Sequence, residues 1–449
     1  MGKLFGTDGI RGEANRYPMD AGMAFSVGQA VAYLFKKKDH RARVVIGKDT
    51  RISGYMLESS LEAGISSMGG ISYLVRVLPT PGIAFITQSM RADAGIVISA
   101  SHNPYQDNGI KIFAGSGFKL SDEQEETIEG LILGGKLPDM VPPASEMGRS
   151  YRMEDAPGRY IVFLKNTFPR ELSMEGMKVV IDAANGATYR VSPAAFTELG
   201  ADVDIIHNNP SGLNINDNCG SQYTRDLQKR VVEKGAAIGL AFDGDGDRLI
   251  AVDEKGGVIT GDQILMICAK VLKDQGRLKN DLVVSTVMSN LGLTLACKKH
   301  GFKHHASKVG DRYVLEDMQG LGAVIGGEES GHMIFLDHHT TGDGILTALQ
   351  VIAAMIKEEK SLSELAGLMD VFPQKLINVP VTSKPDISTV SQVVEAIKEV
   401  EARLGEKGRV LVRYSGTQNA CRVMVEGPTD SLTETYCRKI ADAVKASIG

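Results

Sequence analysis

A short apolar run followed by a loop rich in glycine, serine, asparagine or charge recurs along this chain. The first example is VVIGKDTR at 44–51, and others follow at 95–104, 178–186, 238–248, 282–290, 323–332 and 410–418. Helix-like stretches lie between the runs, among them 121–133, 224–234, 261–273 and 343–358. This alternation of strand and helix predicts parallel α/β sheets. Because ligands bind such sheets at the carboxyl ends of the strands, the loops after the runs are the first candidates for a site.

The chain is too long for a single hydrophobic core. Its 449 residues indicate about three domains on length alone. Residues 134–148 contain paired glycines and paired prolines, which separate a first domain from a second, and the turn at 254–257 opens a third. Beyond Phe372 the pattern changes to strand, helix, strand, strand and a last helix near 430–446. This order predicts a smaller α+β unit at the carboxyl end.

Composition excludes several classes of protein. The net charge is −5, and no basic run is longer than Lys36–Lys38, which argues against a nucleic-acid partner. The five cysteines show no CxxC spacing, so reduced thiols in a cytoplasmic protein are the simplest interpretation. No signal-like segment begins the sequence, and the longest apolar stretch, near 345–356, is too short to cross a bilayer. We therefore expect a soluble cytoplasmic protein with no membrane partner.

Ser101 follows one of the buried runs, in the sequence Ile98-Ser99-Ala100-Ser101-His102-Asn103-Pro104. Pro104 disfavours helix before it, which predicts a loop at the carboxyl end of the strand. A hydroxyl placed there could act as a nucleophile or carry a transferred group. The alternative is a loop serine that bonds only to nearby backbone. Ser101 and His102 are not expected to form a hydrolase dyad, because neighbours on extended backbone point to opposite sides.

Three carboxylates alternate with glycines directly after another apolar run. Asp243, Asp245 and Asp247 would repel one another unless a cation lies among them. Hard oxygen ligands in this number suit Mg²⁺ or Ca²⁺ and not zinc. An EF-hand calcium loop ending at Glu254 is the structural rival, but its sixth position would be Arg248 where glycine is needed. Three carboxylates leave Mg²⁺ open to substrate oxygens, which suits phosphoryl transfer.

Two further loops carry groups that bind phosphates and sugars. The segment Arg413–Gln418 offers a guanidinium, two hydroxyls and glycine-exposed backbone, and Arg422 could add a second guanidinium. The alternative is a polar turn between strands at 409–413 and 421–426. The loop at 326–332 gathers Glu328, Ser330 and His332, and carboxylates with hydroxyls suit sugar hydroxyls. A solvated glycine-rich loop is the alternative there. A third glycine-spaced loop, at 6–12, carries Arg11.

These motifs, in this order, resemble the α-D-phosphohexomutase superfamily over the whole chain. The matching segments are FGTDGIRG (5–12), VVIGKDTRISG (44–54), ISASHNP (98–104), NGIK (108–111), INDNCGS (215–221), DGDGDR (243–248), VMSNLG (287–292), VGDRYV (309–314) and the loop at 413–417. FGTDGIRG and VMSNLG are most similar to the branch that acts on glucosamine phosphates. The resemblance implies three similar mixed α/β domains around a central cleft and a smaller α+β domain at the carboxyl end. The expected boundaries are 1–153, 154–253, 254–370 and 371–449.

The resemblance also implies roles for individual residues. Ser101 would be active as phosphoserine and, with Asp243, Asp245 and Asp247, would hold Mg²⁺. Arg11, Lys111 and His332 match catalytic positions near the transferred phosphoryl group. Substrate binding is assigned to Arg248, Glu328, Ser330, Arg413, Ser415, Gly416, Thr417 and Arg422. Either Lys111 or His332 would move the hydroxyl proton, and the sequence leaves both open.

The implied reaction interconverts glucosamine 6-phosphate and glucosamine 1-phosphate through a hexosamine bisphosphate, and it would supply UDP-N-acetylglucosamine synthesis for cell-wall precursors. Phosphomannomutase or phosphoglucomutase activity, a Mg²⁺-dependent sugar phosphatase and a calcium sensor are the alternatives. Glu329 stands where most members of the glucosamine branch have Gln, and Tyr414 replaces the commoner Pro of the phosphate loop. These departures leave the sugar preference open, and a homodimer is also left open.

Overall fold

The apolar runs form strands in the computed structural model, which describes residues 4–6, 8–415 and 419–449. The chain divides into two units, each of which is described by itself. The first holds the chain up to Val287 together with Lys303–Gly367, and the second holds Met288–Phe302 with Leu368–Gly449. Among the described residues, we find no helix with the length and apolar character needed to cross a membrane.

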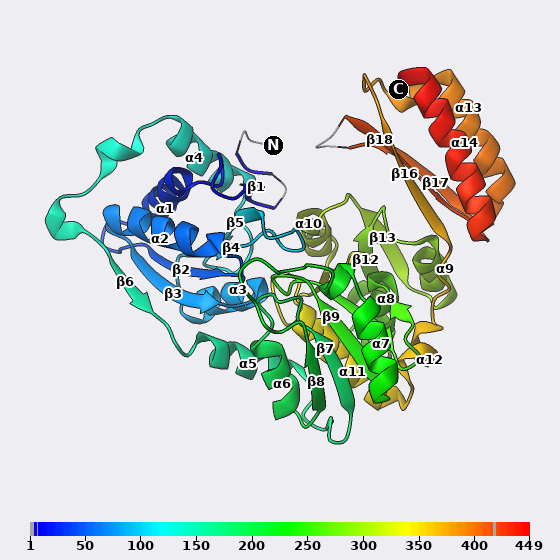
Figure 1. Cartoon of the computed structure of the whole chain (residues 1–449), viewed down its shortest axis with the longest axis horizontal. Helices are drawn as coiled ribbons and strands as arrows, with labels where there is room; N and C mark the ends of the chain where they lie inside the picture. Colours follow the sequence, from blue (N-terminus) through cyan, green and yellow to red (C-terminus); the bar gives the residue numbers. More distant parts are fainter. Residues whose placement is uncertain (1–3, 7, 416–418) are drawn as a thin grey trace. The chain divides into compact units, whose positions relative to one another are not determined.

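The first domain is a six-stranded sheet between two layers of helices (Figure 1). Its strands are β1 (Ile10–Glu13), β2 (Arg43–Lys48), β3 (Ile71–Val77), β4 (Ala94–Ile98), β5 (Asp107–Ala114) and β6 (Arg149–Arg152), in the order β1-β5-β4-β2-β3-β6. Its helices are α1 (Ala21–Phe35), α2 (Ser53–Ser67), α3 (Thr80–Ser89) and α4 (Asp122–Leu133). Alternate side chains face opposite layers: Val44 and Ile46 pack with α1 and α2, whereas Gly47 faces Ile83 of α3.

The sequence predicts parallel pairing, and the centre of this sheet confirms it. Strands β4, β2, β3 and β6 are parallel, whereas β5 runs antiparallel to both β4 and β1. The difference has a local cause: the loop 99–106 joins β4 directly to β5 without a helix, and a parallel pair needs a longer crossover.

The second domain has a five-stranded sheet in the order β11-β10-β9-β7-β8. Its elements are α5 (Ala156–Thr167), β7 (Lys178–Asp182), α6 (Val191–Glu198), β8 (Asp202–Ile206), α7 (Arg225–Lys234), β9 (Ile238–Phe242), β10 (Leu249–Asp253) and β11 (Val258–Ile259). Leu227 and Val231 of α7 cover Val180 on one face of the sheet. Strands β9 and β10 are antiparallel, and the acidic loop 243–248 is the turn between them.

The third domain has four strands in the order β13-β12-β14-β15. Its elements are α8 (Gly261–Asp274), β12 (Leu282–Thr286), β13 (Lys303–Ser307), α10 (Asp311–Leu321), β14 (Ile325–Gly327), β15 (Met333–Phe335), α11 (Gly344–Glu358) and α12 (Leu362–Ala366). Val314 and Met318 of α10 pack against Val284 of β12. Like the first two, this domain is a mixed α/β sheet, so the expectation of three similar domains is confirmed.

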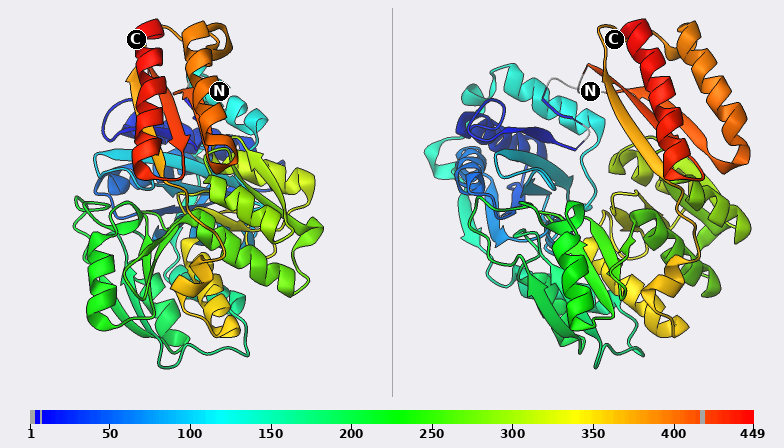
Figure 2. Two further views of the ribbon diagram at one scale, coloured as in Figure 1. Left: turned by 90° about the vertical axis from the view of Figure 1, so that its right-hand side faces the viewer. Right: turned by 45° about the vertical axis from the view of Figure 1, so that its right-hand side comes forward.

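The second unit holds α9 (Leu291–Lys299) and a smaller antiparallel sheet, which confirms the expected α+β domain. Its strands β16 (Gln374–Pro380), β17 (Arg409–Tyr414) and β18 (Ala420–Glu426) lie in the order β16-β18-β17. Helices α13 (Ser391–Leu404) and α14 (Asp430–Ile448) lie side by side along this sheet (Figure 2). The fully buried carboxylate of Glu426 accepts from Leu291 N at 2.8 Å and from Arg409 Nε at 2.7 Å, which joins α9 to the sheet.

Candidate active site

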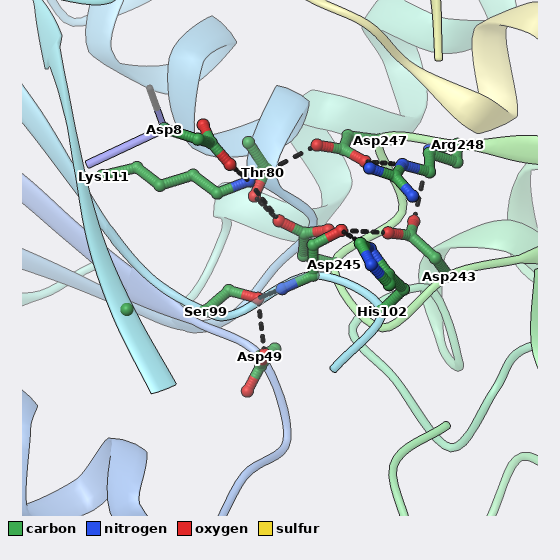
Figure 3. Close-up of polar contacts among 12 residues, drawn as sticks. Asp8, Asp49, Thr80, Ser99, His102, Lys111, Asp243, Asp245, Asp247 and Arg248 are labelled. Carbon is green, nitrogen blue, oxygen red and sulfur yellow. Dashed lines mark hydrogen bonds and ion pairs between the residues drawn. The ribbon is translucent and has the colours of Figure 1, made fainter. Parts of the chain in front are cut away.

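The loops that follow β2, β4 and β9 meet within the first unit. They carry Asp49, Ser101 and Asp243 respectively, each one to three residues beyond the end of its strand. Figure 3 shows the polar side chains from these loops converging with Lys111 of β5. The structure therefore brings these three strand-end loops together, as the sequence predicts.

Ser101 is almost completely buried, and its hydroxyl faces the acidic loop. Its Oγ donates to Asp243 Oδ2 at 2.6 Å. Its backbone N–H donates to Ser99 Oγ at 2.9 Å, and Ser99 Oγ donates to Asp49 Oδ2 at 2.6 Å. The backbone of Ser101 has a φ of +53°, in the left-handed region that non-glycine residues rarely adopt. Such a conformation persists only where the surroundings hold it firmly.

Two side chains hold the backbone carbonyl of Ser101. Arg51, which has no exposed surface, donates from Nη2 to Ser101 O at 3.2 Å and from Nε to Asp107 O at 2.8 Å. Asn216 of the second domain donates to Ser101 O and to Asn103 O, at 2.9 Å each. Gly244 completes the contact, because a Cβ there would lie 2.5 Å from Ser101 O. The serine loop is thus fixed by residues from two domains.

The three aspartates of the acidic loop bring carboxylate oxygens within 4.8 Å of one another. All three are buried, and Asp245 Oδ1 and Asp247 Oδ1 have no hydrogen-bond partner among the described residues. Burial and the charges of Asp247 and Asp245 raise the pKa of Asp243 well above its usual range. Buried carboxylate oxygens with free lone pairs fit a hard divalent cation. The site therefore has the donor set of a metal site.

The EF-hand alternative for this loop is wrong. The segment lies between antiparallel strands β9 and β10, where an EF-hand needs flanking helices. Glu254, the expected last ligand, lies beyond β10 and accepts from Ser363 Oγ at 2.5 Å and from Ser363 N at 3.3 Å.

Lys111 of β5 reaches the acidic loop from the first domain. Its Nζ lies 3.0 Å from Asp245 Oδ2 and 3.4 Å from Asp247 Oδ2, and the side chain is 2% exposed. Burial alone would lower the pKa of Lys111, but the nearby carboxylates outweigh it, and the pKa is raised well above its usual value. Lys111 is therefore held as a cation beside the acidic loop.

The carboxylate of Asp8 is surrounded by three basic side chains. It accepts from Arg11 and from Lys119, and it lies 3.2 Å from Lys111 Nζ. Burial disfavours the charge of Asp8, but these cations outweigh burial and hold its pKa well below the usual range. The buried Nε of Arg11 has no hydrogen-bond partner within residues 4–6, 8–415 and 419–449, so the described part of the cluster has an unused donor.

The third domain adds His332, Glu328 and Asp311 to this cluster. His332 Nδ1 lies 3.7 Å from Asp247 Oδ2, and its Nε2 lies 3.8 Å from Asp311 Oδ2. Burial lowers the pKa of His332, but Asp247 and Asp311 outweigh it and bring the pKa to about 8. Glu328 Oε1 accepts from Gly310 N at 3.1 Å, whereas Ser330 is exposed. Arg248 N donates to Asp243 Oδ1 at 3.2 Å.

The expectation that the side chains of Ser101 and His102 point to opposite sides is wrong. His102 Nδ1 lies 3.2 Å from Ser101 Oγ, so the two side chains do share a side. The reason is the left-handed φ of Ser101, which removes the alternation that extended backbone would give. Burial, Arg248 and Arg11 lower the pKa of His102 to about 4. A neutral imidazole thus contacts the serine hydroxyl, although no carboxylate bonded to its second nitrogen completes a triad among the described residues.

The phosphate-loop residues lie in the second unit. Arg413 and Arg422 are directly paired across strands β17 and β18. Burial and the charge of Arg422 lower the pKa of Arg413, and Arg422 Nε is buried with no hydrogen-bond partner in the part of the chain that the structure describes. Ser415 is 2% exposed, and its backbone carbonyl accepts from Lys384 Nζ at 2.9 Å. Gly416 and Thr417 lie outside the described residues. The two adjacent guanidinium groups favour an anion at this sheet.

Several residues of the cluster are not singled out by the sequence reasoning: Asp8, Asp49, Arg51, Thr80, Lys119, Asn216 and Asp311. The signal for Asp49 and Arg51 is present, because they directly follow the apolar run of β2, as Ser101 follows β4. Thr80 begins α3 and donates to Asp245 Oδ2 at 2.6 Å. Lys119 bridges Asp8 and Asp311 across two domains, a contact that no local pattern indicates.

Sequence patterns of phosphoglucomutase/phosphomannomutase match in four parts: alpha/beta/alpha domain I at 2–138, domain II at 158–257, domain III at 260–372 and the C-terminal domain at 376–443. The chain belongs to this family, the α-D-phosphohexomutases, and is an isomerase of that class.

Phosphoglucosamine mutases of that family are similar to the chain over its full length. The one from Syntrophobacter fumaroxidans is 78% identical over 449 residues, which cover all of both chains. The solved structure of a family protein from Burkholderia thailandensis has a TM-score of 0.78 at 24% identity and covers 99% of this chain and 97% of its own. An Aspergillus fumigatus N-acetylphosphoglucosamine mutase, solved with GlcNAc-6P and magnesium, has a TM-score of 0.67 at 16% identity and covers 99% of this chain and 96% of its own.

Proposed function

We propose that this chain interconverts glucosamine 6-phosphate and glucosamine 1-phosphate by way of a phosphoserine at Ser101. The observation that carries the choice of sugar is the 78% identity, over the full length of both chains, to a phosphoglucosamine mutase. The buried hydroxyl of Ser101, held 2.6 Å from Asp243 at the meeting point of strand ends, supports its role as the phosphoryl carrier.

In this proposal the phosphoryl group passes from Ser101 Oγ to O1 or O6 of the hexosamine phosphate. A general base, for which Lys111 and His332 are the two candidates, takes the proton of the sugar hydroxyl as the new P–O bond forms. The bond from phosphorus to Ser101 Oγ breaks, the released serine oxygen takes up a proton, and the product is a bisphosphate. The bisphosphate turns over without leaving, and its other phosphoryl group returns to Ser101. Lys111, Arg11 and Arg248 supply fixed positive charge where the transferring group gathers negative charge.

The residues that would hold Mg²⁺ are Asp243, Asp245, Asp247 and an oxygen of phosphorylated Ser101. The partnerless oxygens of Asp245 and Asp247 fit such an ion. When bound, Mg²⁺ supplies charge neutralisation at the transferred phosphoryl group. Thr80 and Lys111 both donate to Asp245 Oδ2, so Asp245 Oδ1 is the oxygen that stays available for the ion.

The remaining residues are proposed to recognise the sugar and the phosphate of the substrate. Glu328 and Ser330 would contact the sugar hydroxyls, while Arg413, Ser415, Gly416, Thr417 and Arg422 would hold the phosphate that is not transferred. The paired guanidinium groups of β17 and β18 support the second assignment. A cytoplasmic location and a supply of UDP-N-acetylglucosamine synthesis belong to the same proposal.

Comparison of kcat/KM for three substrates tests the proposed sugar. Glucosamine 6-phosphate, glucose 1-phosphate and mannose 1-phosphate are each assayed with Mg²⁺ and a trace of sugar bisphosphate, and isomer and free phosphate are both measured. We expect the hexosamine to be preferred by at least about tenfold, with no free phosphate released. A hexose that equals or exceeds it would overturn the choice of sugar and make Glu329→Gln the next variant. Release of free phosphate would indicate a phosphatase.

A further inference from the structure

A second set of metal-ligating side chains lies in the second domain, and the phosphoryl-transfer site does not use it. Asp182 ends β7, His207 follows β8, and Cys219 precedes the short helix Gly220–Gln222. One ligand atom from each lies within 4.8 Å of the other two. Asp182 and Cys219 are buried, whereas the side chain of His207 is 26% exposed, which leaves a path for an ion to enter.

His207 is oriented by carboxylates on both ring nitrogens. Its Nδ1 lies 3.0 Å from Asp182 Oδ2, and its Nε2 lies 3.4 Å from Asp226 Oδ2 on α7. A proton on Nε2 facing Asp226 would direct the lone pair of Nδ1 at Asp182, and the buried Nδ1 makes no hydrogen bond of good geometry with any described residue. Two lone pairs at this separation repel each other unless a cation or a proton lies between them. A carboxylate behind a ligating imidazole is the usual arrangement at zinc sites.

The other two ligands are fixed in place by the backbone around them. Asp182 Oδ1 accepts from Ala184 N at 2.8 Å, and its Oδ2 accepts from Gly220 N at 2.9 Å. Gly220 has a φ of +73°, and a Cβ there would lie 2.5 Å from Phe242 O, so only glycine allows this approach. The backbone that bonds Asp182 therefore also brings Cys219, one residue earlier, to the same point.

We propose that Asp182 Oδ2, His207 Nδ1 and Cys219 Sγ form a second metal site, for a divalent ion of the zinc class. A thiolate, an imidazole and a carboxylate are the donors that zinc takes, whereas Mg²⁺ takes oxygens only. Solvent supplies the fourth ligand, as at other zinc sites with three protein ligands. On binding, the Cys219 thiol gives its proton to solvent as the bond from Sγ to the metal forms. Asp226 is a positioning residue for His207.

A metal bound by Asp182, His207 and Cys219 would stabilise the loop 207–219, which supports Ser101. Residues 207–219 form no helix or strand and include left-handed backbone at His207, Asn216 and Asn218. Asn216 of this loop donates to Ser101 O and Asn103 O. A metal at the ligand set would tie both ends of the loop to β7. The rival explanation is a proton on His207, which would satisfy Asp182 and Asp226 with no metal at all.

Cobalt binding separates the two explanations. The full chain is stripped with chelator, supplied with saturating Mg²⁺ to fill the acidic loop, and titrated with Co²⁺. A thiolate ligand gives Co²⁺ a near-ultraviolet charge-transfer band, which oxygen ligands do not give. We expect the band to saturate at one equivalent, to disappear on addition of zinc and to be absent in Cys219→Ser. The control Cys268→Ser removes a buried thiol of α8 and should keep the band.

A surface variant tests the orientation of His207 without disturbing buried groups. Asp226 is 63% exposed, and Asp226→Asn should weaken zinc binding by about tenfold to a hundredfold. Glu233→Gln, on the same helix but paired with Lys229, should leave the affinity unchanged. Absence of the band in the unaltered chain, or an equal band in Cys219→Ser, would overturn the metal site in favour of the proton. Equal zinc affinity in Asp226→Asn would overturn the role of Asp226.

Discussion

At the scale of single residues, the site depends on one unfavourable backbone conformation. Ser101 adopts a left-handed φ of +53°, which costs of order 1 kcal/mol or more for a residue with a side chain. The hydrogen bonds from Arg51 and Asn216 to its carbonyl offset that cost, and Asp243 accepts from its hydroxyl. The direction of the hydroxyl is therefore set before any substrate binds, as preorganised catalysis requires.

The acidic loop gives the first prediction. Asp245→Asn keeps the shape of the loop but removes one charge, so Mg²⁺ affinity and turnover should both fall. In wild type, Mg²⁺ at about a hundred times its Kd should stabilise the native state by about 2.7 kcal/mol, and the variant should lose most of this gain. Thermal unfolding of wild type and variant, each with Mg²⁺ and with excess chelator, measures the stabilisation by Mg²⁺. An activity assay measures turnover. Asp202→Asn, at an exposed position of β8, is the control. Full activity of wild type in excess chelator would contradict the account.

At the scale of elements, the sequence predicts most of the strands and helices but not all of the pairing. The helix-like stretches 224–234 and 343–358 correspond closely to α7 (Arg225–Lys234) and α11 (Gly344–Glu358). Their apolar periodicity and capping residues are local features, which a sequence displays directly. The antiparallel placement of β5 follows from the short loop 99–106, which contains no helix, and the general alternation of strand and helix does not reveal this exception.

The sequence likewise predicts some residues of the candidate site and misses others. Ser101 and the three aspartates stand out because each follows an apolar run. Asp8 and Lys119 do not stand out in the sequence. Asp8 lies among basic side chains from β1, from β5 and from the segment that follows β5, and only the fold brings these together. His102 is wrongly placed by a rule for extended backbone, since the left-handed turn at Ser101 arises from Arg51 and Asn216, which are distant in sequence. The sequence pattern does not show these contacts between residues that are far apart in the chain.

The amino-terminal cap of α11 gives the second prediction. Asp343 is buried, its Oδ1 accepts from Leu346 N at 3.0 Å, and its Oδ2 accepts from Tyr160 Oη at 2.9 Å. Burial raises the pKa of Asp343 to about 7 from 3.8. A group with a raised native pKa gives stability that is complete below pH 3.8 and is lost as the pH rises through 7.

Asparagine caps helices as well as aspartate does, and it carries no charge to bury. Asp343→Asn should therefore match wild type near pH 4 and exceed its stability by about 1–3 kcal/mol at pH 8. Thermal or denaturant unfolding of both proteins across pH 4–8 measures the difference. A variant that loses stability against wild type as the pH rises would show that the charge of Asp343 is favourable in the native state.

At the scale of the whole molecule, the chain combines three similar α/β domains with a fourth of different architecture, and it divides into two units. The groups that we propose for phosphoryl transfer lie in the first unit. The arginines that we propose for phosphate binding lie in the second, where Arg413 and Arg422 pair across β17 and β18. Like charges placed side by side are unfavourable without an anion, which indicates that the arrangement serves a ligand.

This division gives the third prediction. Arg413→Ala should raise KM for the hexosamine phosphate by about tenfold to a hundredfold, the loss expected for a hydrogen bond to a charged group. Phosphorylation of Ser101 by an excess of sugar bisphosphate should be less affected, since the transfer groups stay in place. Arg403→Ala, at an exposed position of α13, is the control. Equal losses in both measurements would indicate that Arg413 maintains the fold and does not hold the phosphate.

The most direct test of the account is the mass of the enzyme before and after it meets substrate. Incubation with hexosamine bisphosphate should add about 80 Da, one phosphoryl group, at Ser101. Addition of excess hexosamine monophosphate should then remove that mass as bisphosphate forms. Ser101→Ala should still fold, gain no mass and lose nearly all turnover. A variant that keeps more than about a tenth of the activity, or that gains the same mass at another residue, would contradict a phosphoryl carrier at Ser101.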